Sequence, residues 1–234
     1  MNNIVIGAQE GAAQPTRGLI IRDAWVVCAP MCRVRSGFER TDGRHKGYNY
    51  FMPEYRRIFH PGGTYFLTLV TYKRQNIFSI SKTVALLHES IEHVICLHPF
   101  KIVAFVFLPD HLHFIWRLPE GDANYSTRIS QIKRRFSKQY IAIFGAQLKK
   151  SASQDKRREL TIWQRRFWEH WICDEEDLNQ HIDYIHYNPV KHGLVDRVCE
   201  WKVSSFHDYV KAGFYDSSWG QGFHVDEKKY TFGE

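Results

Sequence analysis

Residues 102–118, IVAFVFLPDHLHFIWRL, contain two apolar runs separated by a Pro-Asp pair. The first run, Ile102 to Leu108, is rich in β-branched and aromatic residues and predicts a buried strand. Pro109 and Asp110 are turn residues, and the second run, His111 to Leu118, predicts another strand. The stretch therefore predicts an antiparallel hairpin.

Further strand and helix signals lie on both sides of this hairpin. Before it, the turn residues 61–63 precede residues 65–72, which are aromatic and β-branched and predict a strand. Ser81 is a suitable N-cap for a helix that ends before Pro99. After the hairpin, residues 126–144 predict a long helix, because five apolar side chains fall within about 80° of its circumference. These five are Ile129, Ile132, Phe136, Tyr140 and Ile143.

A last helix is predicted to begin at Asp174, an N-cap followed by the acidic residues 175–177, which a helix N-terminus favours. It is expected to end near Asn188, because Pro189 disfavours a helical backbone in the residue before it. Strands interleaved with helices, two of them in a hairpin, predict an α+β fold with one antiparallel sheet packed against helices.

The 234 residues have the composition of an ordinary globular protein, with 44% hydrophobic and 24% charged residues. The apolar runs are much shorter than the roughly 20 residues of a membrane helix, and the N-terminus lacks the pattern of a secretory signal. The spacing of the five cysteines fits neither a disulfide framework nor a zinc-binding pair. These features predict a soluble, reduced protein of the cytoplasm without membrane contact.

The organised pattern covers only part of the chain. Residues 1–51 contain six of the fifteen glycines and no sustained apolar period, which predicts a poorly ordered extension. Met52 stands directly before the organised pattern, so the extension is alternatively a stretch upstream of the native start. We therefore expect one domain over residues 52–215 and a C-terminal tail over residues 216–234.

Positive charge is concentrated in one region. The formal net charge is +7, and residues 123–154 hold seven basic and no acidic side chains. A long stretch of one sign favours contact with nucleic acid, although a solvated surface is the alternative. Residues 163–171 combine arginines with aromatic side chains, which either contact phosphates and stack on bases or pack in the core. The residues expected to contact DNA are Arg128, Lys133, Arg134, Arg135, Lys138, Arg165, Arg166 and Trp168.

His111 and His113 are two residues apart in the predicted hairpin. Alternate residues of a strand share a face, so both imidazoles point the same way and are able to bind one metal ion. Because the chain has thirteen histidines, two separately bonded histidines are the alternative.

In the last helix, Tyr184 shares a stripe with three other polar residues. It lies about 40° from Asn188, about 20° from Asp177 and about 60° from His181 on the helical wheel. The stripe is either an ordinary polar face or a tyrosine nucleophile one turn from a further metal ligand.

Several other catalytic motifs are absent from the sequence. It has no GxxxxGK[ST] phosphate-binding loop. His88 and Glu89 begin a zincin-like pattern, but Glu92 stands where HExxH requires its second histidine. The cysteine spacing of zinc deaminases is missing as well. The sequence therefore excludes these classes of site.

The histidine pair and the last helix together resemble a known family. FLPDHLHFIW (107–116) and YIHYNPVKHG (184–193) resemble motifs of the single-tyrosine HUH transposases. WQRRFWE (163–169) and YRR (55–57) resemble the branch associated with repetitive extragenic palindromes of bacteria. The resemblance covers about residues 52–215, with the motifs in the same order and at similar spacing.

This resemblance implies a ferredoxin-like α+β fold that carries an HUH nuclease site. By it, His111 and His113 would be metal ligands and Asn188 a third ligand through its side-chain oxygen, where wider relatives have glutamine. Tyr184 would be the nucleophile, with Tyr187, about 60° away on the wheel, as the alternative. The implied metal ion is Mg²⁺ or Mn²⁺.

The implied reaction cuts one DNA strand through a 5′-phosphotyrosine intermediate, frees a 3′-hydroxyl and rejoins DNA without ATP. The implied substrate is a hairpin of a palindromic repeat with a short single-stranded tag, bound by a monomer or a homodimer. Two alternatives remain open. One is a non-catalytic DNA- or RNA-binding regulator derived from a transposase, and the other is a metal-dependent nuclease that uses water.

Overall fold

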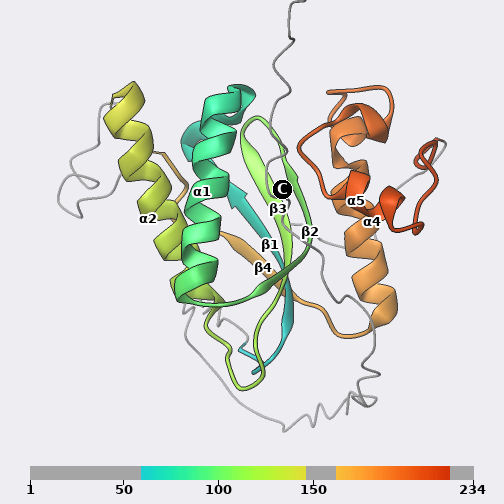
Figure 1. The fold of residues 1–234 in the computed structure, drawn as a ribbon, viewed down its shortest axis with the longest axis horizontal. Coiled ribbons are helices and arrows are strands. Elements are labelled where there is room, and N and C mark those ends of the chain that lie inside the picture. Colours follow the sequence, from blue (N-terminus) through green and yellow to red (C-terminus); the bar gives the residue numbers. More distant parts are fainter. Residues whose placement is uncertain (1–58, 146–161, 222–234) are drawn as a thin grey trace, which may run out of the picture.

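The hairpin predicted from residues 102–118 is present in the structure (Figure 1). In the computed structural model, which describes residues 59–145 and 162–221, its strands are β2 (Lys101–Phe107) and β3 (His111–Arg117). The N–H of Leu108 donates to the carbonyl oxygen of His111 over 2.9 Å and closes the turn. The extension predicted for residues 1–51 lies outside the described residues.

Two more strands complete a four-stranded sheet. β1 (Thr64–Val70) pairs with β3, and the short β4 (Trp168–Trp171) pairs with β1, so the strand order is β2-β3-β1-β4 and every pair is antiparallel. The helix α1 (Ser81–Leu97) lies between β1 and β2 along the chain, and α2 (Tyr125–Phe144) lies between β3 and β4. Two strand–helix–strand units with this order form the ferredoxin-like α+β fold that the resemblance implies.

The remaining helices follow β4. They are α4 (Glu175–Lys191) and α5 (Phe206–Lys211), and the described residues also form the short 3₁₀ helices η1 (Tyr72–Arg74), η2 (Ile77–Ser79) and η3 (Val198–Glu200).

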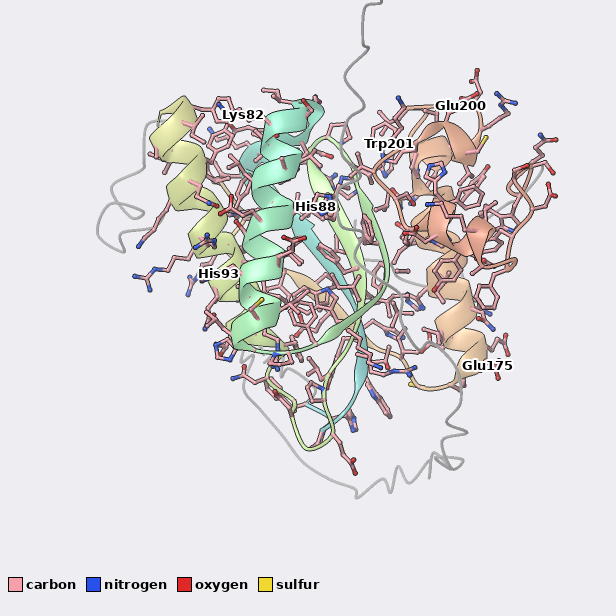
Figure 2. The ribbon with its side chains drawn as sticks, viewed as in Figure 1. Lys82, His88, His93, Glu175, Glu200 and Trp201 are labelled. Carbon is pink, nitrogen blue, oxygen red and sulfur yellow. The ribbon has the colours of Figure 1, made fainter. Side chains whose placement is uncertain are left out.

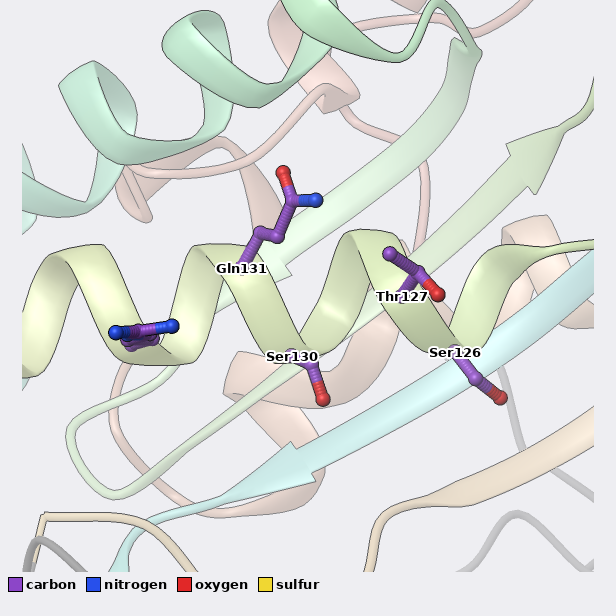
Figure 3. Close-up of a pocket in the computed structure, with 5 residues that line it drawn as sticks. Ser126, Thr127, Ser130 and Gln131 are labelled. Carbon is purple, nitrogen blue, oxygen red and sulfur yellow. The ribbon is translucent and has the colours of Figure 1, made fainter.

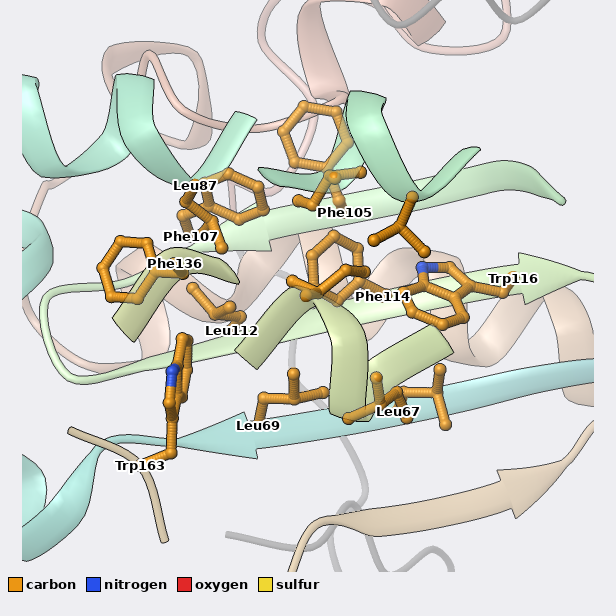
Figure 4. Close-up of a cluster of buried hydrophobic side chains, with 14 of the residues drawn as sticks. Leu67, Leu69, Leu87, Phe105, Phe107, Leu112, Phe114, Trp116, Phe136 and Trp163 are labelled. Atoms are coloured by element: carbon orange, nitrogen blue, oxygen red, sulfur yellow. The ribbon is translucent and has the colours of Figure 1, made fainter. Parts of the chain in front are cut away.

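The helices α1 and α2 cover one face of the sheet (Figure 4). Alternate residues of a strand point to the same side, so Leu67 and Leu69 of β1 join Leu87 of α1 and Phe136 of α2 in one apolar cluster. Trp163 belongs to the same cluster and is only 7% exposed. Of the two roles open to this tryptophan, the structure therefore shows core packing.

The helices α4 and α5 lie on the opposite face of the sheet (Figure 1). There Phe66 and Ile115 of the sheet cluster with Ile182 and Ile185 of α4. Trp201 lies in the segment after α4 (labelled in Figure 2). Its indole N–H donates to the carbonyl oxygen of Phe107 over 3.0 Å, which attaches this segment to β2. The sheet thus separates two layers of helices, each packed on its own cluster.

The helix α4 begins as predicted and ends later than predicted. Asp174 is its N-cap and accepts a hydrogen bond from the N–H of Asp177 at 2.9 Å. The predicted end near Asn188 is wrong, because Pro189 stands in the last turn of a helix that continues to Lys191. Proline removes only one hydrogen bond there. The helix ends before Gly193, whose φ of 63° is a conformation that glycine adopts without strain.

Packing continues past Tyr215, where the tail was expected to begin. The ring centroid of Trp219 lies 4.5 Å from that of Tyr215 and 6.0 Å from that of Phe206. Gly220 has a φ of 95°, and a Cβ there would lie 2.7 Å from Cγ2 of Val198. This close approach requires glycine, so the packed region extends at least to this residue.

None of the helices within residues 59–145 and 162–221 combines the length and the apolarity needed to cross a membrane.

Candidate active site

His111 and His113 lie on β3 and face the layer of α4. Ile115, two residues further, belongs to the cluster under α4, whereas Leu112 and Phe114 belong to the opposite cluster. Both histidines are buried, and their ring centroids lie 5.0 Å apart. Because β3 is hydrogen-bonded on both edges, the sheet holds the backbone of this pair firmly. The structure brings the two imidazoles together, as their spacing predicts.

Each imidazole uses its Nδ1 atom for a polar contact within the sheet. Nδ1 of His111 lies 2.5 Å from Oδ1 of Asp110, and Nδ1 of His113 lies 3.0 Å from Oγ1 of Thr68. Burial alone would raise the pKa of Asp110, but the hydrogen bonds from His111 and Arg74 hold that pKa below its usual range. Metal-binding histidines are typically oriented by such a contact on the nitrogen that does not bind the metal. The donor set therefore fits a divalent ion bound through Nε2.

Tyr184 on α4 lies against this histidine pair. It is 1% exposed, and its ring centroid lies 5.4 Å from that of His113 and 6.0 Å from that of Phe66, edge-on to both. Tyr187, the alternative nucleophile, lies beside Gly220, where a Cβ would be 3.6 Å from its Cδ2 atom. The ring contact with His113 is made by Tyr184.

The last turn of α4 and its C-cap residue add three polar side chains. Asn188, one turn after Tyr184, is fully buried. The ammonium of Lys191 donates to the hydroxyl of Tyr184 over 3.2 Å, and the ring of His192 lies 5.1 Å from that of His111. Sequence reasoning assigned no role to Lys191 or His192, although Lys191 lies only about 20° from Tyr184 on the helical wheel.

No profile of a known protein family matches the chain, but individual proteins do. It is 45% identical over 172 residues to a Haemophilus influenzae protein named as a REP-associated tyrosine transposase, covering 72% of this chain and 94% of that protein. It is 40% identical over 168 residues to the REP-associated tyrosine transposase of Escherichia coli K12, covering 72% of this chain and 91% of that protein. The chain belongs to the REP-associated tyrosine transposases.

A solved structure of the same family agrees with this assignment. The structure of a REP-associated tyrosine transposase bound to a REP hairpin matches with a TM-score of 0.63 and 37% identity, covering 78% of this chain and 98% of that chain. The family suggested by the motifs, and its fold, are therefore confirmed. The individual roles of the site residues in this transposase stay predictions.

Arg128 was expected to contact DNA, but in this transposase it is buried. Its guanidinium donates to the carbonyl oxygens of His98, Pro99 and Asn124 at 3.1, 2.8 and 2.9 Å, and to Oδ2 of Asp122 at 2.6 Å. With 4% of its surface exposed, it presents no charge to a phosphate. The structure contradicts a DNA contact for Arg128, because this residue lies on the buried face of α2 with its charge matched by Asp122.

Of the other basic side chains of α2, two are exposed and two donate hydrogen bonds within the protein. Arg134 and Lys138 are exposed. Arg135 donates to Oε1 of Glu89 on α1 over 2.8 Å, and Lys133 donates to a backbone carbonyl oxygen ahead of β4 over 3.0 Å. Arg134 and Lys138 are therefore the residues of α2 best placed for phosphates.

The basic face of α2 and Tyr184 lie on opposite sides of the sheet, and the edge strand β4 lies between them. Arg165 and Arg166 precede β4 and are exposed, while Trp168 of β4 packs on the α4 side with its ring 5.7 Å from Phe66. Of the predicted DNA-binding residues, Lys133, Arg134, Arg165, Arg166 and Trp168 thus outline a path around the β4 edge, whereas Arg135 contacts Glu89 of α1. On α2 this path includes a shallow depression (Figure 3), which is lined by Ser126, Thr127, Ser130, Gln131 and Arg134.

A second polar cluster joins β4 to the first turns of α4. Nε2 of His170 lies 2.9 Å from Oδ2 of Asp177, and Nδ1 of His181 lies 2.9 Å from Oδ1 of the same carboxylate. Burial alone would raise the pKa of Asp177, but hydrogen bonds from both histidines and the N–H of Cys173 hold that pKa far below its usual range. His181 also packs on Phe66, with ring centroids 4.8 Å apart. The sequence stripe had linked Asp177 and His181 to Tyr184, but His170, the second histidine that contacts the Asp177 carboxylate, becomes visible only in the folded sheet.

Proposed function

We propose that this transposase is a metal-dependent enzyme that cleaves and rejoins single-stranded DNA at hairpins of palindromic repeats. The contact between Tyr184 and His113 carries the proposal, in a chain whose relatives are named tyrosine transposases. A phenol against a buried imidazole pair combines a nucleophile with ligands for a divalent ion. This buried arrangement favours an enzyme over a regulator that only binds DNA.

His111, His113 and Asn188 would hold Mg²⁺ or Mn²⁺. When bound, the ion would polarise a non-bridging phosphate oxygen and offset the charge that repels a nucleophile. Imidazole by itself suits zinc at least as well, but an amide oxygen from Asn188 adds a donor of the kind that Mg²⁺ and Mn²⁺ prefer. The Nδ1 contacts of the two histidines with Asp110 and Thr68 support this ligand set, because they aim Nε2 away from the strand.

Tyr184 would attack the phosphorus atom of a phosphodiester in line with the bond to the 3′-oxygen. The phenol oxygen bonds to phosphorus, the bond from phosphorus to the 3′-oxygen breaks, and the phenol proton ends on the departing 3′-hydroxyl. The products are a 5′-phosphotyrosine link and a free 3′-end. Because the covalent link retains the phosphoester bond, the reverse step rejoins the strand without ATP.

The substrate class is supported by the solved relative, which is bound to a REP hairpin. In this chain, exposed cations on α2 and before β4 would contact the phosphates of a stem, and Trp168 would stack on an unpaired base near the Tyr184 face. The DNA-binding set is therefore Lys133, Arg134, Arg135, Lys138, Arg165, Arg166 and Trp168, with Arg128 removed. Acting on chromosomal repeats, the enzyme would work in the cytoplasm at the nucleoid.

End-labelled hairpin DNA incubated with the protein and Mn²⁺ tests this function. The wild type is expected to form a protein–DNA adduct that survives denaturing electrophoresis, and Tyr184→Phe is expected to form none while its DNA affinity stays similar. Tyr187→Phe is the matched control, because it removes the other phenol of this part of α4, and it should still form the adduct. His113→Ala should also lose cleavage.

Each alternative predicts a different result. Adduct formation by Tyr184→Phe would contradict the role of this tyrosine and transfer it to Tyr187. Cleavage without any adduct would indicate a nuclease that uses water, and hairpin binding without cleavage would indicate a regulator.

A further inference from the structure

We propose that Lys191 positions the hydroxyl of Tyr184 for attack and binds the phosphate that this hydroxyl attacks. This inference rests on the proposed function of Tyr184 as the nucleophile. Nζ of Lys191 lies 3.2 Å from the phenol oxygen, to which it donates, and 4.9 Å from the centroid of the ring. One ammonium therefore contacts both the reacting oxygen and the π-system of the same side chain.

Helix geometry explains why Lys191 reaches this tyrosine. The two residues are seven positions apart, which is nearly two turns, so they lie about 20° apart on the same side of α4. Side chains of a helix lean toward its N-terminus, which directs the long lysine chain back toward Tyr184. Lys191 is also the last residue of α4, and the Gly193 backbone at a φ of 63° fixes where that last turn stops.

The ring of Tyr184 packs against groups of the sheet, and Lys191 contacts its hydroxyl. His113 meets the ring from β3 at 5.4 Å between centroids, and Phe66 meets it from β1 at 6.0 Å. A hydroxyl oxygen has two acceptor lone pairs, and a hydrogen bond from Lys191 to one of them fixes the direction of the other. A nucleophile held in its attacking geometry reacts faster than one that has to find it.

The same ammonium is close enough to serve the electrophile. A lysine side chain carries three N–H donors, so the group that holds the phenol oxygen is also able to donate to a non-bridging oxygen of the phosphate. That contact would strengthen as negative charge builds on the non-bridging oxygens in the transition state. His113 contacts the phenol ring from the sheet, and Lys191 contacts the phenol oxygen from α4, so the two residues approach Tyr184 from different sides.

A merely structural role for Lys191 makes a different prediction. A cation in the last turn of a helix stabilises the helix slightly through the helix dipole. In that case its removal would lower the melting temperature slightly and leave the chemical step unchanged. The test therefore measures three quantities separately: the cleavage rate at saturating protein, the affinity for DNA and the melting temperature.

Single-turnover cleavage of end-labelled hairpin DNA by the full chain, with Mn²⁺ and saturating protein, measures the chemical step. Lys191→Gln is expected to reduce this rate by about 100-fold or more, as loss of one preorganised donor commonly does, while the Kd changes by about threefold or less. Lys191→Arg should recover part of the rate, because it keeps the charge but not the geometry of the ammonium. Lys211→Gln is the matched control, because this lysine is 77% exposed and pairs with Asp208 on α5.

All variants are compared at a temperature at which circular dichroism shows each to be folded. An unchanged saturating rate in Lys191→Gln would overturn the inference, and so would a loss that appears entirely as weaker DNA affinity. Tyr184→Phe, measured in parallel, distinguishes failure of the proposed function from failure of the role of Lys191. If it still forms adducts, the proposed function fails; if adducts require Tyr184 and form at the wild-type rate in Lys191→Gln, only the role of Lys191 fails.

Discussion

Replacing the buried Arg128 with alanine is expected to destabilise the fold by about 3–4 kcal/mol without changing the salt dependence of DNA binding. The guanidinium donates to three backbone carbonyl oxygens and to Asp122. Each carbonyl left without this donor costs about 1 kcal/mol. The loss at Asp122 adds less, because its side chain is 33% exposed and water replaces part of the interaction. Arg128→Lys should fall between, at about 2 kcal/mol, since one ammonium cannot reach all the acceptors of the planar fork.

Urea unfolding followed by tryptophan fluorescence measures these differences as shifts of the midpoint at a constant slope. Hairpin affinity is then measured at several salt concentrations where every variant is folded. Because Arg128 is buried and its guanidinium donates to groups within the protein, the plot of log affinity against log salt should keep its slope. Two results together would refute this reasoning. They are a wild-type urea midpoint in both variants and, in Arg128→Ala, a salt slope of hairpin binding reduced by about 0.7–0.9. Arg128 would then return to the DNA-binding set.

Other substitutions test the remaining surfaces. Arg134→Ala combined with Lys138→Ala should leave the urea midpoint unchanged and reduce the salt slope of hairpin binding by about 1.4–1.8, and an unchanged slope would assign both to ordinary solvated surface. The pKa of Asp177 is lower in the folded chain than its unfolded value of about 3.9, so its stabilising contribution is present above that pH and is lost as the pH falls. Below about pH 4 the free energy of unfolding should therefore fall more steeply in the wild type than in Asp177→Asn, which is already less stable at pH 7. Urea unfolding at several pH values measures this, and the same fall in both proteins would contradict the prediction. Phe136→Ala should cost about 3–5 kcal/mol in urea unfolding, because this ring is fully buried under α2.

Periodicity and turn chemistry were sufficient for most of the fold. The Pro-Asp pair located the hairpin, because it interrupts two runs that otherwise satisfy strand patterns. The two-residue spacing of His111 and His113 placed both imidazoles on one face, because the alternation of a strand depends only on local geometry. The order of the strands in the sheet is not contained in any local pattern, and it entered through the family resemblance.

The predictions that failed depend on contacts between distant segments. The sequence predicted DNA contact for Arg128 and Arg134 alike, because both lie in the same basic stretch. In the folded chain, however, Arg128 donates to Asp122 and to the carbonyl oxygens of residues 98 and 99, which are distant from it in sequence. Pro189 was read as a helix end, but a proline in the last turn removes little. His170 gained meaning only once β4 had paired with β1 beside the first turns of α4.

The candidate site joins parts of the chain that are made at different times. His113 on β3 and Tyr184 on α4 are 71 positions apart, and the tyrosine comes second. During translation the histidine strand leaves the ribosome first, while the segment with the phenol is still inside the exit tunnel or not yet synthesised. A nascent chain therefore carries the two histidines proposed as ligands before it carries Tyr184 and Asn188. If Tyr184 is the nucleophile, as proposed, this order leaves an unfinished molecule unable to cut DNA.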